Sequence, residues 1–107
     1  MAAEVRVPRT ENRLPVRIFV KLSNPDTGSS ELTQTVDVSL HGALVLSRNS
    51  FHPNQQLLLR SIRSAFTSWA RVAHCLCRPD GSFAVGLELY KPAADWSSKA
   101  FSGVARS

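Results

Sequence analysis

The sequence predicts an all-β fold: a six-stranded antiparallel β-barrel followed by a short C-terminal helix. Three observations lead to this prediction. Apolar residues recur at every second position in several short runs, short polar turns separate these runs, and no helical pattern lies between any two of them. Parallel strands need long crossover connections, so the sheet is expected to be antiparallel. Six strands on a chain of 107 residues bury one face and remove open edges by closing into a barrel.

The first three strands are expected in the N-terminal half of the chain. Val16, Ile18, Val20 and Leu22 occupy alternate positions, which places these aliphatic side chains on one face of a strand. Turn-forming residues follow from Ser23 to Ser30. The second and third strands are expected at residues 31–38 and 43–47, with a break at 39–42 between them.

The last three strands are expected at residues 55–62, 69–77 and 83–89. Turn residues around Pro53 precede the first of them, and residues 63–67 are expected to turn the chain before the second. Asp80-Gly81 is a hairpin signal, because these residues tolerate the positive φ angles of tight hairpin turns. A short helix is expected to end the chain, because Pro92 suits a first helical position and Ala93, Trp96 and Ala100 follow at helical spacing.

Composition limits the chain to one modest domain with an excess of positive charge. Hydrophobic residues make up 43% of the sequence, enough for a single core, and the formal net charge is +5. Residues 1–21 hold five Lys or Arg and two Asp or Glu, which leaves +3 in this segment. We therefore divide the chain into a basic N-terminal arm, residues 1–14, and a barrel domain, residues 15–107. A basic arm favours anionic ligands.

Several classes of protein are disfavoured. No apolar run approaches the roughly 20 residues of a membrane span, and Met1–Glu4 does not open an apolar leader, so we expect a cytoplasmic protein without membrane insertion. Cys75 and Cys77 are one residue apart and would face the same side of a strand, where a disulfide between them would be strained.

The sequence does not predict an enzyme. His41, His52 and His74 are scattered and do not combine with a carboxylate or serine in a nucleophile arrangement. A zinc site at His74, Cys75 and Cys77 is disfavoured, because strand alternation directs the imidazole away from both thiols and a fourth ligand is lacking. We expect no metal and no cofactor. Nucleic acid is also disfavoured as a ligand, because Phe19, Trp69, Phe83 and Tyr90 do not form a clear stacking face.

Two short motifs carry the functional interpretation. Residues 9–13 read R-T-E-N-R, an R-x-x-x-R pattern, and residues 37–42 read D-V-S-L-H-G, a D-x-S-x-x-G pattern. The first pattern alone is uninformative, because shuffling a chain with ten arginines yields about one chance match per chain. The second pattern is more specific, with roughly 0.05 chance matches per shuffled chain. Their order adds value: the arginines precede the first strand, and the serine motif lies at a strand–turn–strand corner.

Together the two motifs resemble the PilZ domain. Residues 14–17 (LPVR), 42–45 (GALV) and 85–89 (VGLEL) are also similar to sequences of this family, so that the resemblance extends from about Arg9 to Trp96. It implies a six-stranded antiparallel barrel with a C-terminal helix that binds cyclic di-GMP, a bacterial second messenger. By the motif match, Arg9 and Arg13 would contact guanine and phosphate, and Asp37, Ser39 and Gly42 would form the complementary surface on the barrel.

These residue types suit that ligand. The planar guanidinium of arginine can donate two hydrogen bonds to guanine or phosphate oxygens and can stack on a purine, which lysine cannot do. An ionised Asp37 accepts from guanine N–H groups, Ser39 donates or accepts, and Gly42 lets the backbone turn or approach closely. Ordering of the arm by the ligand would act as a switch, with a downstream protein of unknown identity as the partner.

Three alternatives stay open at this point. Arg13 and Arg17 also form R-x-x-x-R, although Arg17 alternates with apolar strand residues, which favours Arg9 and Arg13. Pro8 precedes the first motif arginine at a position linked in the family to holding one ligand or a stacked pair, so the stoichiometry is open. A PilZ-like barrel without nucleotide binding, acting purely as a protein-interaction adaptor, is the main functional alternative.

Overall fold

The computed structural model describes residues 12–93, which form six β-strands. The strands are β1 (Phe19–Ser23), β2 (Ser30–Ser39), β3 (Gly42–Ser47), β4 (Gln56–Ser61), β5 (Thr67–Cys77) and β6 (Phe83–Leu89). Within this range no helix is long and apolar enough to cross a membrane. The predicted C-terminal helix, except for its first residues Pro92 and Ala93, lies outside the described residues.

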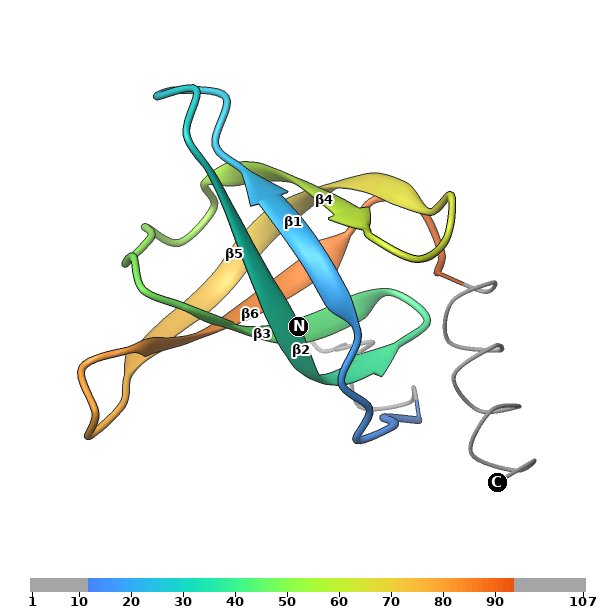
Figure 1. Ribbon diagram of the computed structural model, residues 1–107, viewed down its shortest axis with the longest axis horizontal. Coiled ribbons are helices and arrows are strands. Elements are labelled where there is room, and N and C mark those ends of the chain that lie inside the picture. Colours follow the sequence, from blue (N-terminus) through green and yellow to red (C-terminus); the bar gives the residue numbers. More distant parts are fainter. Residues whose placement is uncertain (1–11, 94–107) are drawn as a thin grey trace, which may run out of the picture.

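The strands close into a barrel in the order β1-β2-β3-β6-β5-β4 (Figure 1). Every neighbouring pair is antiparallel, and β1 pairs with both β2 and β4, which closes the ring. The predicted six-stranded antiparallel barrel is therefore confirmed. Closure satisfies the backbone groups of both strands that would otherwise be sheet edges.

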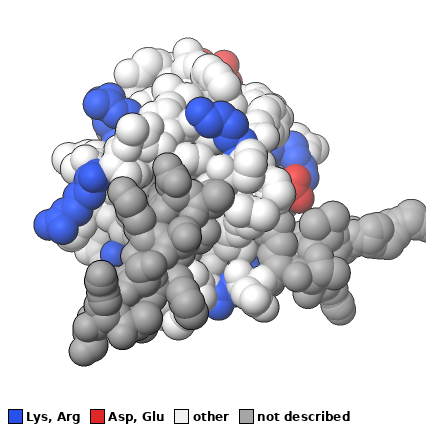
Figure 2. Space-filling view, turned by 90° about the vertical axis from the view of Figure 1, so that its right-hand side faces the viewer, with Lys and Arg blue, Asp and Glu red and all other residues white. Residues whose placement is uncertain are grey.

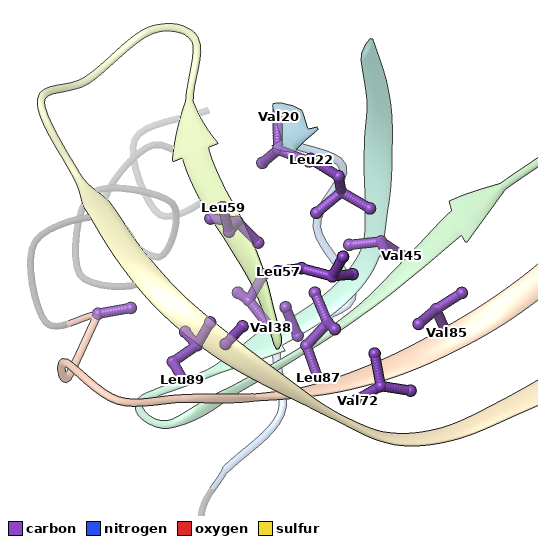
Figure 3. Packing of buried hydrophobic residues seen from close by; sticks show 13 residues of the cluster. Val20, Leu22, Val38, Val45, Leu57, Leu59, Val72, Val85, Leu87 and Leu89 are labelled. Carbon is purple, nitrogen blue, oxygen red and sulfur yellow. The ribbon is translucent and has the colours of Figure 1, made fainter. Parts of the chain in front are cut away.

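One side of every strand faces a common apolar interior (Figure 3). Val20 and Leu22 on β1 and Leu57 and Leu59 on β4 are almost completely buried, as the period-two pattern predicts. The remaining buried hydrophobic residues are Val38, Ala43, Val45, Ala70, Val72, Val85, Leu87, Leu89 and Ala93. The side chains between these buried residues point outward, so a ligand that binds to strand side chains would contact the outer surface of the barrel.

The first strand begins at Phe19, three residues later than the alternation predicts. The register of β2 shifts between Thr35 and Asp37, and Thr35 is completely buried there. Its hydroxyl accepts a hydrogen bond from the Ile18 amide (2.8 Å) and donates one to the Val16 carbonyl (2.7 Å). The Thr35 amide still donates to the Ile18 carbonyl (3.0 Å), but the hydroxyl takes the place of a backbone carbonyl as the acceptor for the Ile18 amide. This is the physical reason why the regular strand is shorter than predicted.

The two ends of the barrel are built differently. At one end a two-residue turn, residues 40–41, joins β2 to β3. At the other end lie the β1–β2 turn, in which Gly28 has a φ of 78°, and the loop between β3 and β4. The D-x-S-x-x-G motif lies at the first end, so the turn that the sequence predicts at residues 39–42 becomes a corner on the barrel rim.

Candidate functional site at the corner between β2 and β3

Arg13 and Asp37, one from each motif, contact each other directly. The Arg13 Nη1 atom donates a hydrogen bond to the Asp37 Oδ1 atom at 2.6 Å, in an ion pair whose side chains are 49% and 22% exposed. The backbone brings them together, because the Leu14 amide donates to the Val38 carbonyl (2.8 Å) and the Val38 amide donates to the Leu14 carbonyl (3.0 Å). The end of the basic arm is therefore fixed beside β2.

Gly42 and Ser39 are packed tightly at the corner. A Cβ atom at position 42 would lie 3.1 Å from the Ser39 Oγ atom and 3.4 Å from the Leu87 carbonyl oxygen. Gly42 is not among the described glycines with positive φ, which are Gly28 and Gly81. Of the two roles predicted for Gly42, close approach is therefore the one that applies. A larger residue would crowd the hydroxyl of Ser39, a residue that is only 5% exposed.

Backbone hydrogen bonds from the end of the barrel sequence hold the corner in place. The Leu89 amide donates to the His41 carbonyl (2.9 Å), and the Ala93 amide donates to the Leu40 carbonyl (2.7 Å). Both turn residues are thus tied to the chain that leaves β6. The corner presents its polar groups from a fixed backbone, which lowers the entropy cost of binding a ligand there.

The structure places four of the five predicted site residues around one point and does not describe the fifth. Arg13, Asp37, Ser39 and Gly42 all lie at the corner between β2 and β3. Arg9 lies outside the described residues. The alternative motif arginine, Arg17, lies in the segment that leads into β1 and is exposed.

A second charged group beside the corner escaped the sequence-based prediction. Gly42 pairs with Glu88 on β6, and Glu88 pairs with Arg71 on β5. The Arg71 guanidinium donates to the Glu88 carboxylate and, at 2.5 Å, to the Asn54 side-chain oxygen. The outward alternation of Arg71 between Ala70 and Val72 is visible in the sequence, but its partners become neighbours only through the sheet register.

The opposite end of the barrel holds an open cavity of about 290 Å³. Its lining is formed mainly by hydroxyl and amide side chains over Leu22, Phe51 and Leu57, and Glu31 is the one charged lining residue. The Glu31 carboxylate accepts hydrogen bonds from the Ser47 hydroxyl (2.7 Å) and the Arg48 amide (2.8 Å). This cavity offers no basic side chain to a phosphate, whereas the corner offers Arg13.

The residues weighed as a zinc site serve the packing of β5 and β6. His74 pairs with Gly86, and a Cβ atom on Gly86 would lie 2.3 Å from the His74 Nε2 atom, so the imidazole covers the glycine. Cys75 packs partly against the core, and both cysteines are free thiols. Cys77 is exposed.

Comparison with known proteins gives the fold and the family. The family model described as PilZ domain matches residues 8–95. The solved structure of the Bacillus subtilis inhibitor of motility (MotI/DgrA) is similar to this chain, with a TM-score of 0.68 and 18% sequence identity over 92% of it. The chain spans half the length of that protein. No curated protein sequence matches the chain.

The family match and the geometry agree on the same region of the molecule. PilZ domains form a family of cyclic di-GMP receptors and adaptors, ligand-binding and interaction domains rather than enzymes. The match covers both motifs and all six strands, and the solved structure confirms the fold independently of them. The chain therefore belongs to the PilZ domain family.

Proposed function

We propose that this protein is a cyclic di-GMP receptor that binds the nucleotide at the corner between β2 and β3, closes its N-terminal arm over it and signals through a protein partner. The observation that carries the proposal is the contact between the Arg13 and Asp37 side chains, which joins the two motifs at one place. Arg9 and Arg13 supply guanidinium groups for guanine and phosphate. Asp37, Ser39 and Gly42 supply the complementary surface.

The contact between Arg13 and Asp37 is compatible with an exchange of partners on binding. A guanine base meets the hydrogen-bonding needs of both side chains, because its O6 and N7 atoms accept from the guanidinium and its N–H groups donate to the carboxylate, whereas a phosphate can accept from Arg13 only. An ion pair as exposed as this one contributes about 0–1 kcal/mol to stability. Charge-assisted bonds to the ligand therefore outweigh the cost of separating the pair.

The backbone hydrogen bonds of the corner support different roles for the two motifs: the D-x-S-x-x-G motif stays in place, and the R-x-x-x-R motif moves onto the ligand. The corner is held by Leu89 and Ala93 and changes little on binding, so that the ligand chiefly orders the arm that precedes Leu14. Ordering of a segment by a ligand has an entropic cost, and it changes the surface that a partner meets. The output of this protein is accordingly an interaction, not a turnover.

Isothermal titration calorimetry with cyclic di-GMP tests the proposal. Arg9→Ala and Arg13→Ala are each expected to weaken binding by about 1.5–3 kcal/mol, roughly tenfold to more than a hundredfold, because each removes a charge-assisted contact. Arg6→Ala and Arg17→Ala are the matched controls and are expected to have far smaller effects.

Three outcomes of this titration are informative. Equal small losses for all four arginine variants would indicate diffuse attraction and contradict a defined site. A large loss for Arg17→Ala with none for Arg9→Ala would assign the arginine motif to residues 13 and 17. The absence of heat in the wild-type protein would contradict the receptor role and favour the adaptor without nucleotide binding.

A further inference from the structure

The outer surface of the barrel over β1, β4 and the start of β2 combines exposed apolar side chains with cations that have no acidic partner among residues 12–93. We call it the β1–β4 face; it consists of Arg17, Phe19, Lys21, Leu32, Arg60 and Ile62. Its three hydrophobic members are exposed to 53% (Phe19), 72% (Leu32) and 49% (Ile62). They are three of the largest apolar groups that the described part of the barrel leaves in contact with solvent.

The sheet register makes these residues neighbours. Lys21 pairs with Leu32 on one side and with Arg60 on the other. The Ile62 amide donates a hydrogen bond to the Phe19 carbonyl (3.0 Å), which places these two residues side by side next to the Lys21–Arg60 pair. Two cations and three large apolar side chains thus form one continuous patch.

The direct opposition of Lys21 and Arg60 is unfavourable for the isolated protein. Like charges at directly opposite positions of an antiparallel pair repel each other. Within residues 12–93 the ion pairs are Arg13–Asp37 and Arg71–Glu88, so Lys21, Arg60 and Arg17 have no acidic partner there. Figure 2 shows one side of the molecule, on which basic side chains outnumber acidic ones.

From this arrangement we infer that the β1–β4 face is the docking surface for an acidic segment of a partner protein that carries large apolar side chains. Such a segment neutralises Lys21 and Arg60 and buries Phe19, Leu32 and Ile62 in the same contact. The inference gives a chemical class to the protein partner of the proposed function and rests on the adaptor part of that function, not on nucleotide binding.

Other occupants fit the face less well. A second copy of this chain would bring the same cations together across a two-fold axis. The chain's own segments outside residues 12–93 carry no surplus of acidic residues: residues 1–11 have two basic and two acidic side chains, and residues 94–107 have two basic and one acidic. An added β-strand finds no free edge, because β1 is already paired on both sides.

A single-stranded nucleic acid also meets the wrong chemistry. Such ligands stack their bases on several aromatic side chains beside the cations. The β1–β4 face has one aromatic residue, Phe19, and its other apolar members, Leu32 and Ile62, are aliphatic. The exposed Trp69 lies beyond the face on β5, opposite Leu58. Aliphatic side chains between cations favour an acidic peptide with apolar residues.

Selection from a random peptide display library on the full chain tests the inference. Enriched peptides are expected to combine Asp or Glu with bulky apolar residues. Their Kd, measured by fluorescence anisotropy, is expected to rise about tenfold or more in the double variant Lys21→Glu/Arg60→Glu, because charge reversal replaces attraction by repulsion. The control Arg78→Glu reverses one charge at the turn between β5 and β6, away from the face, and is expected to leave the Kd nearly unchanged.

Misfolding is separated from loss of docking by the single variant Lys21→Glu. It creates an opposite-charge pair with Arg60 and is expected to leave the melting temperature equal or higher while still weakening the peptides. Enriched peptides without an acidic surplus, or equal losses in the face and control variants, would overturn the inference. Binding of a fluorescein-labelled oligo-dT strand that is lost in the face variant would overturn it in favour of nucleic acid.

Calorimetry with cyclic di-GMP on the same face variant keeps the two proposals apart. Its nucleotide affinity is expected to equal that of the wild type, because none of the substituted residues belongs to the corner between β2 and β3. Peptide binding without any nucleotide heat would contradict the receptor proposal and support the docking face. Nucleotide binding, together with peptides that bind the wild type and the face variant equally well, would support the receptor proposal and contradict the docking face.

Discussion

The two ends of this barrel differ in how their backbones are held and in what they offer a ligand. At the corner between β2 and β3, the carbonyls of both turn residues accept hydrogen bonds from Leu89 and Ala93, and Arg13 contacts Asp37 beside them. At the other end, an open cavity is lined by neutral polar groups and one carboxylate that is already hydrogen-bonded. The corner thus offers an anion the guanidinium of Arg13, whereas the lining of the cavity offers no basic side chain.

The difference between the two ends suggests that the residues of the proposed nucleotide site and the residues of the core can be changed independently in this fold. The outward side chains of the corner contribute little to the core, whereas core residues such as the fully buried Leu57 form part of the cavity lining. Substitutions at the cavity end should therefore change stability more than nucleotide binding, and substitutions at the corner the reverse.

The largest effect is expected at the cavity end. Leu57 is completely buried, and Leu57→Ala is expected to lower the free energy of unfolding by about 2–5 kcal/mol through lost burial and the void left behind. Urea denaturation measures the change. Nucleotide affinity, titrated at a temperature where the variant is folded, is expected to stay near that of the wild type. A parallel loss of affinity in the folded variant would show that the two ends are coupled.

Thr35 tests how the segment that leads into β1 is held on the barrel. Thr35→Val removes the hydroxyl that bonds the Ile18 amide and the Val16 carbonyl, and the unpaired backbone groups are expected to reduce stability by about 1–3 kcal/mol. Thr35→Ser keeps the hydroxyl and is the matched control. Chemical denaturation that gives equal losses for the two variants would assign the role of Thr35 to its methyl group instead.

A smaller effect is expected at the corner itself. In Gly42→Ala the new methyl group lies 3.1 Å from the Ser39 Oγ atom, and the strain is expected to reduce stability by about 1 kcal/mol. It should also weaken cyclic di-GMP binding, because the serine hydroxyl is displaced. The double variant Ser39→Ala/Gly42→Ala relieves the crowding and is expected to regain stability without regaining affinity. A single variant with unchanged affinity would argue against a ligand at this corner.

The smallest effect concerns the turn between β5 and β6. The hydroxyl and the amide of Ser82 donate to the Asp80 carboxylate (2.6 and 2.9 Å), which lowers the pKa of Asp80 in the folded protein. The carboxylate is therefore stabilising above its unfolded pKa, and this contribution is lost as the pH falls through the lower folded value. The substitution Ser82→Ala is expected to raise the pKa of Asp80, which an NMR pH titration measures. An unchanged value would remove the assigned cause.

The fold was largely predictable because its rules are local. Period-two alternation, short apolar runs and the turn residues between them indicated all six strands, and the Asp80-Gly81 signal marks a turn in which Gly81 has a φ of 88°. The start of β1 was wrong by three residues, because the buried hydroxyl of Thr35 substitutes for ladder hydrogen bonds along residues 16–18. Alternation reports which side of a strand is buried, but not which polar group satisfies the backbone.

The candidate site was predictable only in part. The two motifs identified Arg13, Asp37, Ser39 and Gly42, which the fold brings to one corner. Neither motif predicted that Arg13 and Asp37 would pair with each other. Nor did the alternation predict that Arg71, Glu88 and Asn54 would form a cluster beside Gly42. Such contacts depend on the register between strands that are distant along the chain. The position of Arg9 stays a prediction.

An NMR titration of the ¹⁵N-labelled protein with cyclic di-GMP tests the central claim most directly. The account predicts that the amide signals of Ser39 and Gly42 and the guanidinium signal of Arg13 shift together and saturate at the same ligand ratio, while Ser29 and Asn49 at the cavity end stay in place. Shifts confined to the cavity end, or shifts at the corner without any at Arg13, would contradict it.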